Sequence, residues 1–199
     1  MIVVLEGPTG AGKSSIARGL ANRINWPIYR PFRSDPRNHN PGSQDDRLQL
    51  LPDFKINTWR EDLYTADLCA VLRPNMIFDR SMPSGVAYAL EEMSELQRQT
   101  AVQLWAERMK LASAVIIYAD AESHVRSLRG SRQGDWEKHH IFDACQRAFQ
   151  AGVPMWIMDT MLPVAALVDA IQGSIVDHDG ETRHFLKRCT IARSPTGVL

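Results

Sequence analysis

Residues 7–14 have the types and spacing that proteins use to hold a phosphate group. They read Gly-Pro-Thr-Gly-Ala-Gly-Lys-Ser and fit the pattern G-x-x-x-x-G-K-[ST] at every fixed position. Glycines in such a loop let the backbone turn its N–H groups toward phosphate oxygens, and Lys13 adds a positive charge. A glycine-rich turn that binds nothing is the alternative for this segment.

The residues on either side of this loop favour phosphate binding. Residues 2–5 are a short β-branched run typical of a buried strand. After the loop, Ile16, Leu20 and Ile24 recur at helical spacing. The loop is therefore predicted to join a strand to a helix, whose N-terminus carries a positive partial charge suited to anions.

A second candidate site follows the apolar run at residues 76–78, where Asp79 and Arg80 end a predicted strand. A carboxylate at the end of a strand beside a phosphate loop is placed where Mg²⁺ needs an organising acid. The planar fork of Arg80 suits a phosphate. Such an Asp-Arg pair by itself is more often a structural ion pair. Because the phosphate loop is also present, the sequence favours a functional role for Asp79 and Arg80.

Two further groups of arginines could bind anions. Arg30, Arg33 and Arg37 follow a predicted strand at residues 27–29, at the sheet edge where ligands bind in open α/β proteins. An anionic acceptor site and a solvated loop are both open for this segment.

The other group, Arg126, Arg129 and Arg132, lies in a segment at about 124–136 that also contains two glycines. The glycines indicate a flap that can move. The basic end of an ordinary helix is the alternative.

Composition limits the function classes. The chain has 199 residues with 23 basic and 23 acidic side chains, whereas proteins that bind nucleic acid usually have more basic than acidic side chains. This balance favours a small diffusing substrate over nucleic acid. Cys69, Cys145 and Cys189 are far apart and are typical of reduced thiols in a cytoplasmic protein. The apolar N-terminus is too short for a signal peptide, and no run reaches the roughly 20 residues that span a bilayer.

Strand and helix patterns alternate along the chain, which predicts an α/β fold with a mostly parallel sheet and helices on both faces. We expect one domain over residues 1–175 and a polar, poorly ordered tail at 176–199. The strands are predicted at 2–5, 27–29, 76–78, 114–118 and 153–158. After the first helix, further helices are predicted at about 57–73, 84–90, 94–111, 121–128, 136–149 and 163–171.

Together these features predict phosphoryl transfer that depends on ATP and Mg²⁺, a reaction that needs positioning and positive charge. Lys13 and the loop amides would hold the donor phosphates, while Ser14 and Asp79 would hold the metal ion. The arginines at 126, 129 and 132 would neutralise the developing charge. The predicted ATP contacts are Gly7, Pro8, Thr9, Gly10, Ala11, Gly12, Lys13, Ser14 and Ser15.

The acceptor is predicted from the balance of arginine and carboxylate. A hydroxyl acceptor benefits from a carboxylate that takes its proton, whereas a phosphate acceptor needs cations. The loop after the second strand holds Arg30, Arg33 and Arg37 but only Asp35 as a base, which favours a nucleoside monophosphate. Two alternatives stay open. One is a hydroxyl acceptor on a nucleoside or on a modified base in DNA, with Asp35 or Asp79 as the base; the other is a regulatory module that binds nucleotide without turnover.

Residues 79–88 resemble a motif of the thymidylate kinase family, because they keep the spacing D-R-x-x-x-S-x-x-A-Y with Ser81 in place of an aromatic. Residues 63–66 resemble that family's Leu-Phe-x-Ala helix. The arginine-bearing flap followed by Asp135 and Glu137 is also similar, as is a late strand that ends in an aspartate. The resemblance covers roughly residues 1–175 and implies a phosphate-loop kinase fold and a homodimer packed through helices.

By this resemblance, Arg80 binds the acceptor phosphate, Tyr88 packs on the deoxyribose and Tyr64 stacks on the nucleobase. Leu68 and Ala89 stand where the family has an arginine and a glutamine. The acid of the family's Arg-Glu-Pro is also missing after the second strand. These departures all touch the acceptor, so the sequence supports a different deoxynucleotide, such as one with a modified pyrimidine, as well as it supports dTMP. The predicted acceptor contacts are Arg30, Arg33, Tyr64, Arg80, Ser84 and Tyr88.

The flap hypothesis is testable through its arginines. We expect Arg129→Ala or Arg132→Ala to lower kcat far more than it weakens ATP binding, because arginines that neutralise transition-state charge contribute about 10³–10⁵ in rate. Steady-state kinetics with ATP as the varied substrate measures both quantities. Unchanged turnover in both variants would exclude the flap from the reaction.

Overall fold

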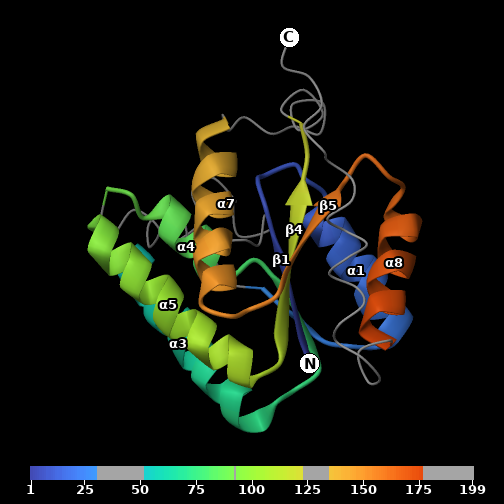
Figure 1. The fold of residues 1–199 in the computed structure, drawn as a ribbon, viewed down its shortest axis with the longest axis horizontal. Helices are drawn as coiled ribbons and strands as arrows, with labels where there is room; N and C mark the ends of the chain where they lie inside the picture. Colours follow the sequence, from blue (N-terminus) through green and yellow to red (C-terminus); the bar gives the residue numbers. More distant parts are fainter. Residues whose placement is uncertain (31–51, 92, 123–134, 177–199) are drawn as a thin grey trace, which may run out of the picture.

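The computed structural model describes residues 1–30, 52–91, 93–122 and 135–176, with the backbone alone described at 52–59 and at 176. Its centre is a five-stranded parallel sheet in the order β2-β3-β1-β4-β5 (Figure 1). The strands are β1 Ile2–Glu6, β2 Ile28–Tyr29, β3 Met76–Asp79, β4 Ala114–Asp120 and β5 Met155–Asp159. The helices are α1 Lys13–Ile24, α3 Pro52–Leu72, α4 Met82–Tyr88, α5 Glu95–Leu111, α7 Asp135–Gln150 and α8 Val164–Val176.

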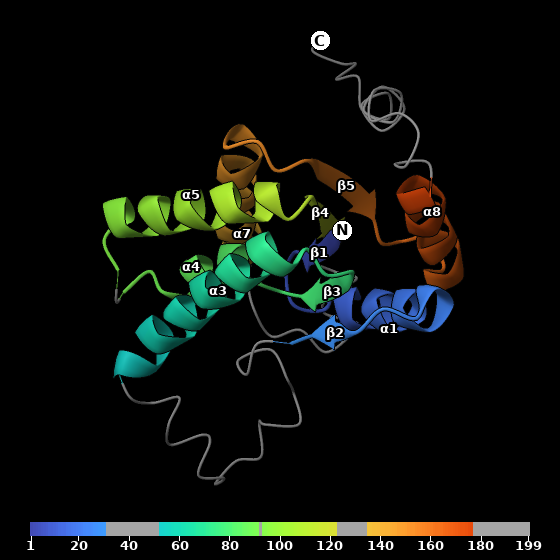
Figure 2. The same ribbon diagram turned by 90° about the horizontal axis from the view of Figure 1, so that it is seen from below.

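Helices cover both faces of the sheet, which confirms the predicted three-layer α/β fold. Helices α1 and α8 lie on one face, and α3, α4, α5 and α7 lie on the other (Figures 1 and 2). Strand β1 shows the consequence: Ile2 and Val4 pack with the larger group of helices, while Val3 and Leu5 pack with α1 and α8. Burial on both faces explains why the strand is a continuous apolar run. Every helix among the described residues is too short or too polar to cross a membrane.

The register of the central strands decides which side chains meet at the edge of the sheet. Strand β1 lies between β3 and β4, with Leu5 beside Asp79 and Glu6 beside Tyr118. Because these strands are parallel, their carboxyl ends lie at one edge of the sheet, where open α/β proteins bind ligands. The loop that follows β1 therefore lies next to the segment that follows β3.

The five predicted strands are confirmed, each within two residues of the observed bounds. The start predicted for the helix at 57–73 is wrong, because α3 begins at Pro52. Proline lacks an N–H but fits the first turn of a helix, where that N–H has no partner. The helix predicted at 84–90 is likewise displaced: α4 spans Met82–Tyr88, with Pro83 in its first turn.

The helix predicted at 136–149 is confirmed, with its start one residue earlier than predicted. Helix α7 begins at Asp135, whose carboxylate lies in the first turn and suits the helix dipole. Of the helix predicted at 121–128, Ala121 and Glu122 are not helical and the other positions lie outside the described residues. The tail at 177–199 also lies outside them.

The first glycine of the loop is required by close packing against β4. Gly7 has a φ of 130°, and a Cβ at this position would lie 2.4 Å from the carbonyl oxygen of Ala119. We expect Gly7→Ala to lower the free energy of unfolding by about 2–5 kcal/mol, because the new methyl group meets backbone and the φ is strained. Urea denaturation measures the change.

A matched control for this substitution lies in α8. A Cβ added at Gly173 meets nothing within 4 Å. We expect Gly173→Ala to be neutral or to stabilise the protein by up to about 1 kcal/mol, since alanine has the higher helix propensity. Equal destabilisation by the two substitutions would contradict the packing argument for Gly7.

Candidate active site

The loop between β1 and α1 has the backbone form of a phosphate-binding loop. Gly10 and Gly12 both have positive φ, at 81° and 88°, and Gly12 is the N-cap of α1. Lys13 is only 5% exposed, and its Nζ donates to the carbonyl oxygen of Pro8 at 2.6 Å. Burial lowers the pKa of Lys13 well below its ordinary value, and the nearby Arg80 lowers it further. The lysine therefore lies over its own loop, among other charged groups.

Carboxylates from three segments act against this lowering. The negative charges of Glu6, Asp79 and Glu137 each raise the pKa of Lys13. Asp79 is the residue that the sequence predicts as a magnesium organiser, so the structure does bring the strand-end acid and the loop lysine into one cluster. Glu6 and Glu137 were not among the predicted site residues.

Asp79 lies at the end of β3 with its side chain 3% exposed, and its Oδ2 is 3.3 Å from the Nε of Arg30. Arg30, a predicted acceptor contact, therefore pairs with the predicted metal-organising acid. The hydroxyl of Ser14 and the carboxylate of Asp79 are hard oxygen donors, which fits Mg²⁺. Among the described residues no group of three or more His, Cys, Asp or Glu side chains could hold a metal ion. A pair of oxygen donors is the set expected when substrate phosphates and water supply the other ligands.

Arg80 is held in an unusual backbone conformation at the turn between β3 and α4. Its φ is 76°, and its N–H donates to the carbonyl oxygen of Leu5 at 3.0 Å. Positive φ is costly for a residue with a side chain and persists only when the surroundings impose it. The conformation directs the guanidinium toward the phosphate loop, where Nη2 donates to Oγ1 of Thr9 at 3.0 Å. The opposite nitrogen, Nη1, donates to Ser84 and Tyr88 at 3.1 and 3.0 Å.

Glu6 holds this turn in place. Its carboxylate is fully buried and accepts hydrogen bonds from the backbone N–H of Ser81, at 2.7 Å, and from the hydroxyl of Ser84. Both carboxylate oxygens are thus used to fix the residues that follow Arg80. The available sequence signal was its position, since Glu6 ends a buried strand immediately before the loop.

Glu137 connects the phosphate loop with the segment that follows β3. Its buried carboxylate accepts from the N–H and the hydroxyl of Thr9, at 3.0 and 2.8 Å, and from the hydroxyl of Tyr88. It also pairs with Arg80 at 3.4 Å. Burial by itself would raise the pKa of Glu137, but the hydrogen bonds from Tyr88 and Thr9 outweigh it, so the pKa is lowered. Burial raises the pKa of Tyr88 to about 12, which keeps its hydroxyl protonated as a donor.

The other predicted site residues are less closely gathered. Tyr64 lies on α3 with 63% of its surface exposed, whereas Arg80 is buried. Ser15 lies in the first turn of α1 and accepts a hydrogen bond from Arg18. Arg33, Arg126, Arg129 and Arg132 lie outside the described residues, so their predicted roles stay predictions.

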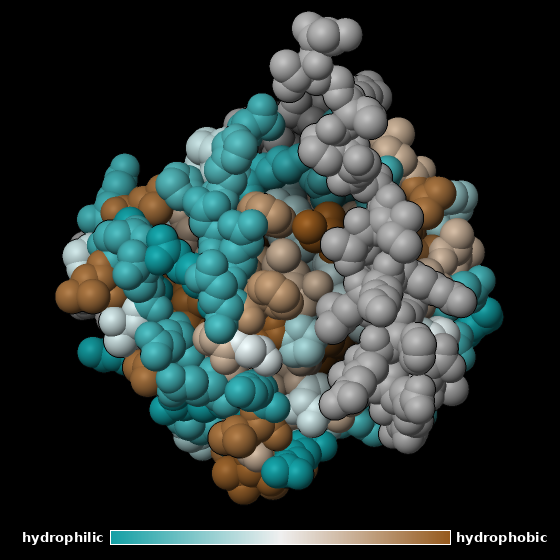
Figure 3. Space-filling model, in the orientation of Figure 1, coloured by the Kyte–Doolittle hydropathy of each residue, from teal (hydrophilic) through white to brown (hydrophobic). Residues whose placement is uncertain are grey.

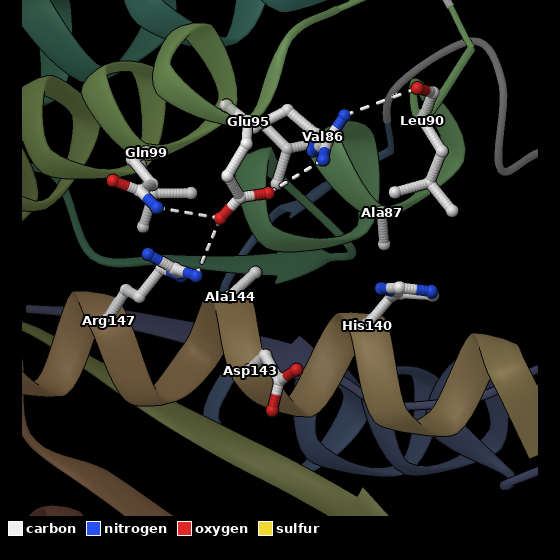
Figure 4. A pocket seen from close by; sticks show the side chains of 11 residues that line it. Val86, Ala87, Leu90, Glu95, Gln99, His140, Asp143, Ala144 and Arg147 are labelled. Atoms are coloured by element: carbon white, nitrogen blue, oxygen red, sulfur yellow. Dashed lines mark hydrogen bonds and ion pairs between the residues drawn. The ribbon is translucent and has the colours of Figure 1, made fainter.

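A separate cavity of about 240 Å³ lies between α4, α5 and α7 (Figure 4). Its lining contains Glu95, which accepts hydrogen bonds from Arg98, Gln99 and Arg147. His140 and Asp143 come from the facing side of α7. No residue of the phosphate loop lines this cavity, nor do Asp79 or Arg80, so it is distinct from the candidate active site.

Comparison with known proteins agrees with this geometry. No family model matches the sequence. The probable thymidylate kinase of Thermoplasma acidophilum is 28% identical over 141 residues, which are 67% of this chain and 72% of that protein. The chain is a kinase whose sequence is similar to that of thymidylate kinase. Its similarity to that enzyme agrees with the resemblance seen in the motif at residues 79–88.

Solved structures support the kinase fold at lower identity. The YorR protein of Bacillus subtilis, solved with phosphorylated GDP, is 17% identical with a TM-score of 0.60, covering 91% of this chain and 99% of that chain. Deoxyadenosine kinase of M. mycoides, solved with dATP, is 17% identical with a TM-score of 0.54, covering 88% and 100%. Shikimate kinase of Acinetobacter baumannii is 11% identical with a TM-score of 0.53, covering 90% and 95%. Kinases whose names imply different acceptors therefore share the fold of this chain.

The buried carboxylate of Glu6 predicts a pH dependence of stability. Burial raises the pKa of Glu6 above the ordinary value of about 4.3 for an unfolded chain. Between the pKa of Glu6 in the unfolded chain and its higher pKa in the folded protein, the folded protein binds more protons than the unfolded chain. The stabilising contribution of protonated Glu6 is therefore present at low pH and is lost as pH rises through the folded pKa. Relative to Glu6→Gln, the wild type should therefore lose unfolding free energy on going from pH 4.5 to pH 8. Urea denaturation across that range tests this, and a difference that does not change with pH would contradict it.

Proposed function

We propose that this kinase transfers the γ-phosphoryl group of ATP to the phosphate of a deoxynucleoside monophosphate, dTMP or a related modified pyrimidine nucleotide. An acceptor phosphate oxygen bonds to the γ-phosphorus while the bond from that phosphorus to the β–γ bridging oxygen breaks. The products are ADP and the deoxynucleoside diphosphate. The observation that carries the proposal is the orientation of Arg80, whose guanidinium faces the phosphate loop at Thr9 from the acceptor side.

On the donor side, the loop amides and Lys13 bind the β- and γ-phosphates. Lys13 leaves the carbonyl oxygen of Pro8 and turns to the phosphate oxygens, for which the N-terminus of α1 is also an attractive site. Ser14 and Asp79 would hold Mg²⁺, which would neutralise phosphate charge. The low-dielectric surroundings of Lys13 strengthen its interaction with an anion.

On the acceptor side, the carboxylates argue for a phosphate over a hydroxyl. A hydroxyl acceptor needs a base that can take its proton. Glu6 has both oxygens engaged by Ser81 and Ser84. Asp79, a candidate base in the sequence, is paired with Arg30. Glu137 has a lowered pKa and accepts from Thr9 and Tyr88. A monophosphate is already a nucleophilic anion, and the planar fork of Arg80 matches its oxygens. Ser84 and Tyr88 of α4 accept hydrogen bonds from the guanidinium and hold it in place.

The substrate is tested with a panel of acceptors. We expect ATP consumption with deoxynucleoside monophosphates, with pyrimidines preferred, and none above background with nucleosides or DNA. A coupled ADP-release assay measures consumption, and chromatography identifies the diphosphate. Activity on nucleosides alone would replace the proposal with hydroxyl phosphorylation, and nucleotide binding without turnover on any acceptor would indicate a regulatory module.

Lys13→Ala tests whether turnover comes from the phosphate loop. Loss of a charge that stabilises the transition state typically costs about 10²–10³-fold in kcat, so we expect a decrease of at least that size. Lys110→Ala, an exposed lysine in the last turn of α5, is the control and should leave kcat unchanged.

A further inference from the structure

Glu137 receives hydrogen bonds from both sides of the proposed reaction centre. From the phosphate loop come the N–H and hydroxyl of Thr9, and from the acceptor segment come Arg80 and the hydroxyl of Tyr88. The side chain is 0% exposed. Four donors on one buried carboxylate fix its position and, in turn, fix the positions of the donors.

Three segments that are far apart in the sequence meet here: the phosphate loop, residues 80–88 and helix α7. Thr9 lies in the loop that holds the donor, Arg80 lies in the turn after β3, and Tyr88 is the last residue of α4. Glu137 lies in the first turn of the 16-residue helix α7, which packs against α4 and α5. A shift of Thr9 therefore changes the surroundings of Arg80 and Tyr88 through one carboxylate on a well-packed helix.

We propose that Glu137 is a positioning residue that couples the donor loop to the acceptor arginine. The proposal rests on the proposed function for the identity of the two substrates. When ATP orders the phosphate loop, Thr9 becomes fixed, and through Glu137 the guanidinium of Arg80 and the hydroxyl of Tyr88 become fixed as well. The acceptor then binds to a preorganised site and binds more tightly after ATP.

The pair of substrates should show reciprocal coupling. Linkage requires that ATP increases the affinity for the acceptor by the same factor as the acceptor increases the affinity for ATP. Such couplings commonly amount to roughly 5–150-fold. A residue that only maintained the fold would change stability without changing this factor.

Glu137→Gln is the informative substitution, because it keeps the size of the side chain. The amide NH₂ cannot accept a hydrogen bond, so a donor such as the N–H of Thr9 loses its partner, and Arg80 loses its opposite charge. Glu95→Gln is the matched control. Glu95 also pairs with two arginines, Arg98 and Arg147, but its side chain is 54% exposed and lies at the separate cavity.

The first experiment is hydrogen–deuterium exchange on the full chain, with and without Mg²⁺ and a non-hydrolysable ATP analogue. In the wild type and in Glu95→Gln, the analogue should slow exchange in residues 7–15 and, by about 5-fold or more, in residues 80–89. In Glu137→Gln, it should slow exchange in residues 7–15 only. Equal slowing of residues 80–89 in all three proteins would overturn the coupling role, and this result needs no acceptor.

The second experiment measures acceptor binding by calorimetry, with and without the analogue, using the acceptor found in the panel. The wild type should show the coupling factor, and Glu137→Gln should bring it within about 2-fold of unity while ATP-analogue affinity alone changes by less than about 3-fold. A lower melting temperature with an unchanged coupling factor would show a merely structural role and overturn the proposal. Absence of any acceptor would overturn the proposed function, while the exchange experiment still decides whether Glu137 joins the two segments.

Discussion

Two cations, Lys13 and Arg80, are buried at the carboxyl edge of the sheet, and the candidate site depends on how their charges are neutralised. An isolated buried charge costs many kcal/mol unless it is paired and hydrogen-bonded. Glu6, Asp79 and Glu137 supply the opposite charges, from the ends of β1 and β3 and the start of α7. Each carboxylate also accepts from, or pairs with, groups that must be held in place. The same charges that make burial tolerable therefore shape the phosphate-binding site.

Strain is concentrated at the same place. Arg80 has a positive φ although it carries a long side chain, and the hydrogen bond to Leu5 and the anchoring of Ser81 by Glu6 impose that conformation. Backbone strain of this kind is commonly found where a functional side chain must point in a particular direction. Here the direction is toward Thr9 of the phosphate loop.

The fold does not select the acceptor. Solved structures with a similar fold include a deoxyadenosine kinase and a shikimate kinase, whose names imply different acceptors. What distinguishes this chain lies at the end of β3 and on α3 and α4. There it keeps Arg80, Ser84 and Tyr88, but it has Leu68 and Ala89 where the thymidylate kinase motif has polar side chains. The proposed acceptor site is therefore where this kinase differs from the family it resembles.

The sequence by itself determined the parts that depend on neighbouring residues. The phosphate loop, the five strands and the Asp79-Arg80 pair at a strand end could all be predicted, because spacing and periodicity describe local backbone geometry. Tertiary structure alone decided which side chains meet. Glu137 bonds to Thr9 across 128 positions, and Glu6 bonds to Ser81 across 75. Contacts between such distant segments depend on strand register and on where each helix packs, and no local pattern in the sequence specifies either.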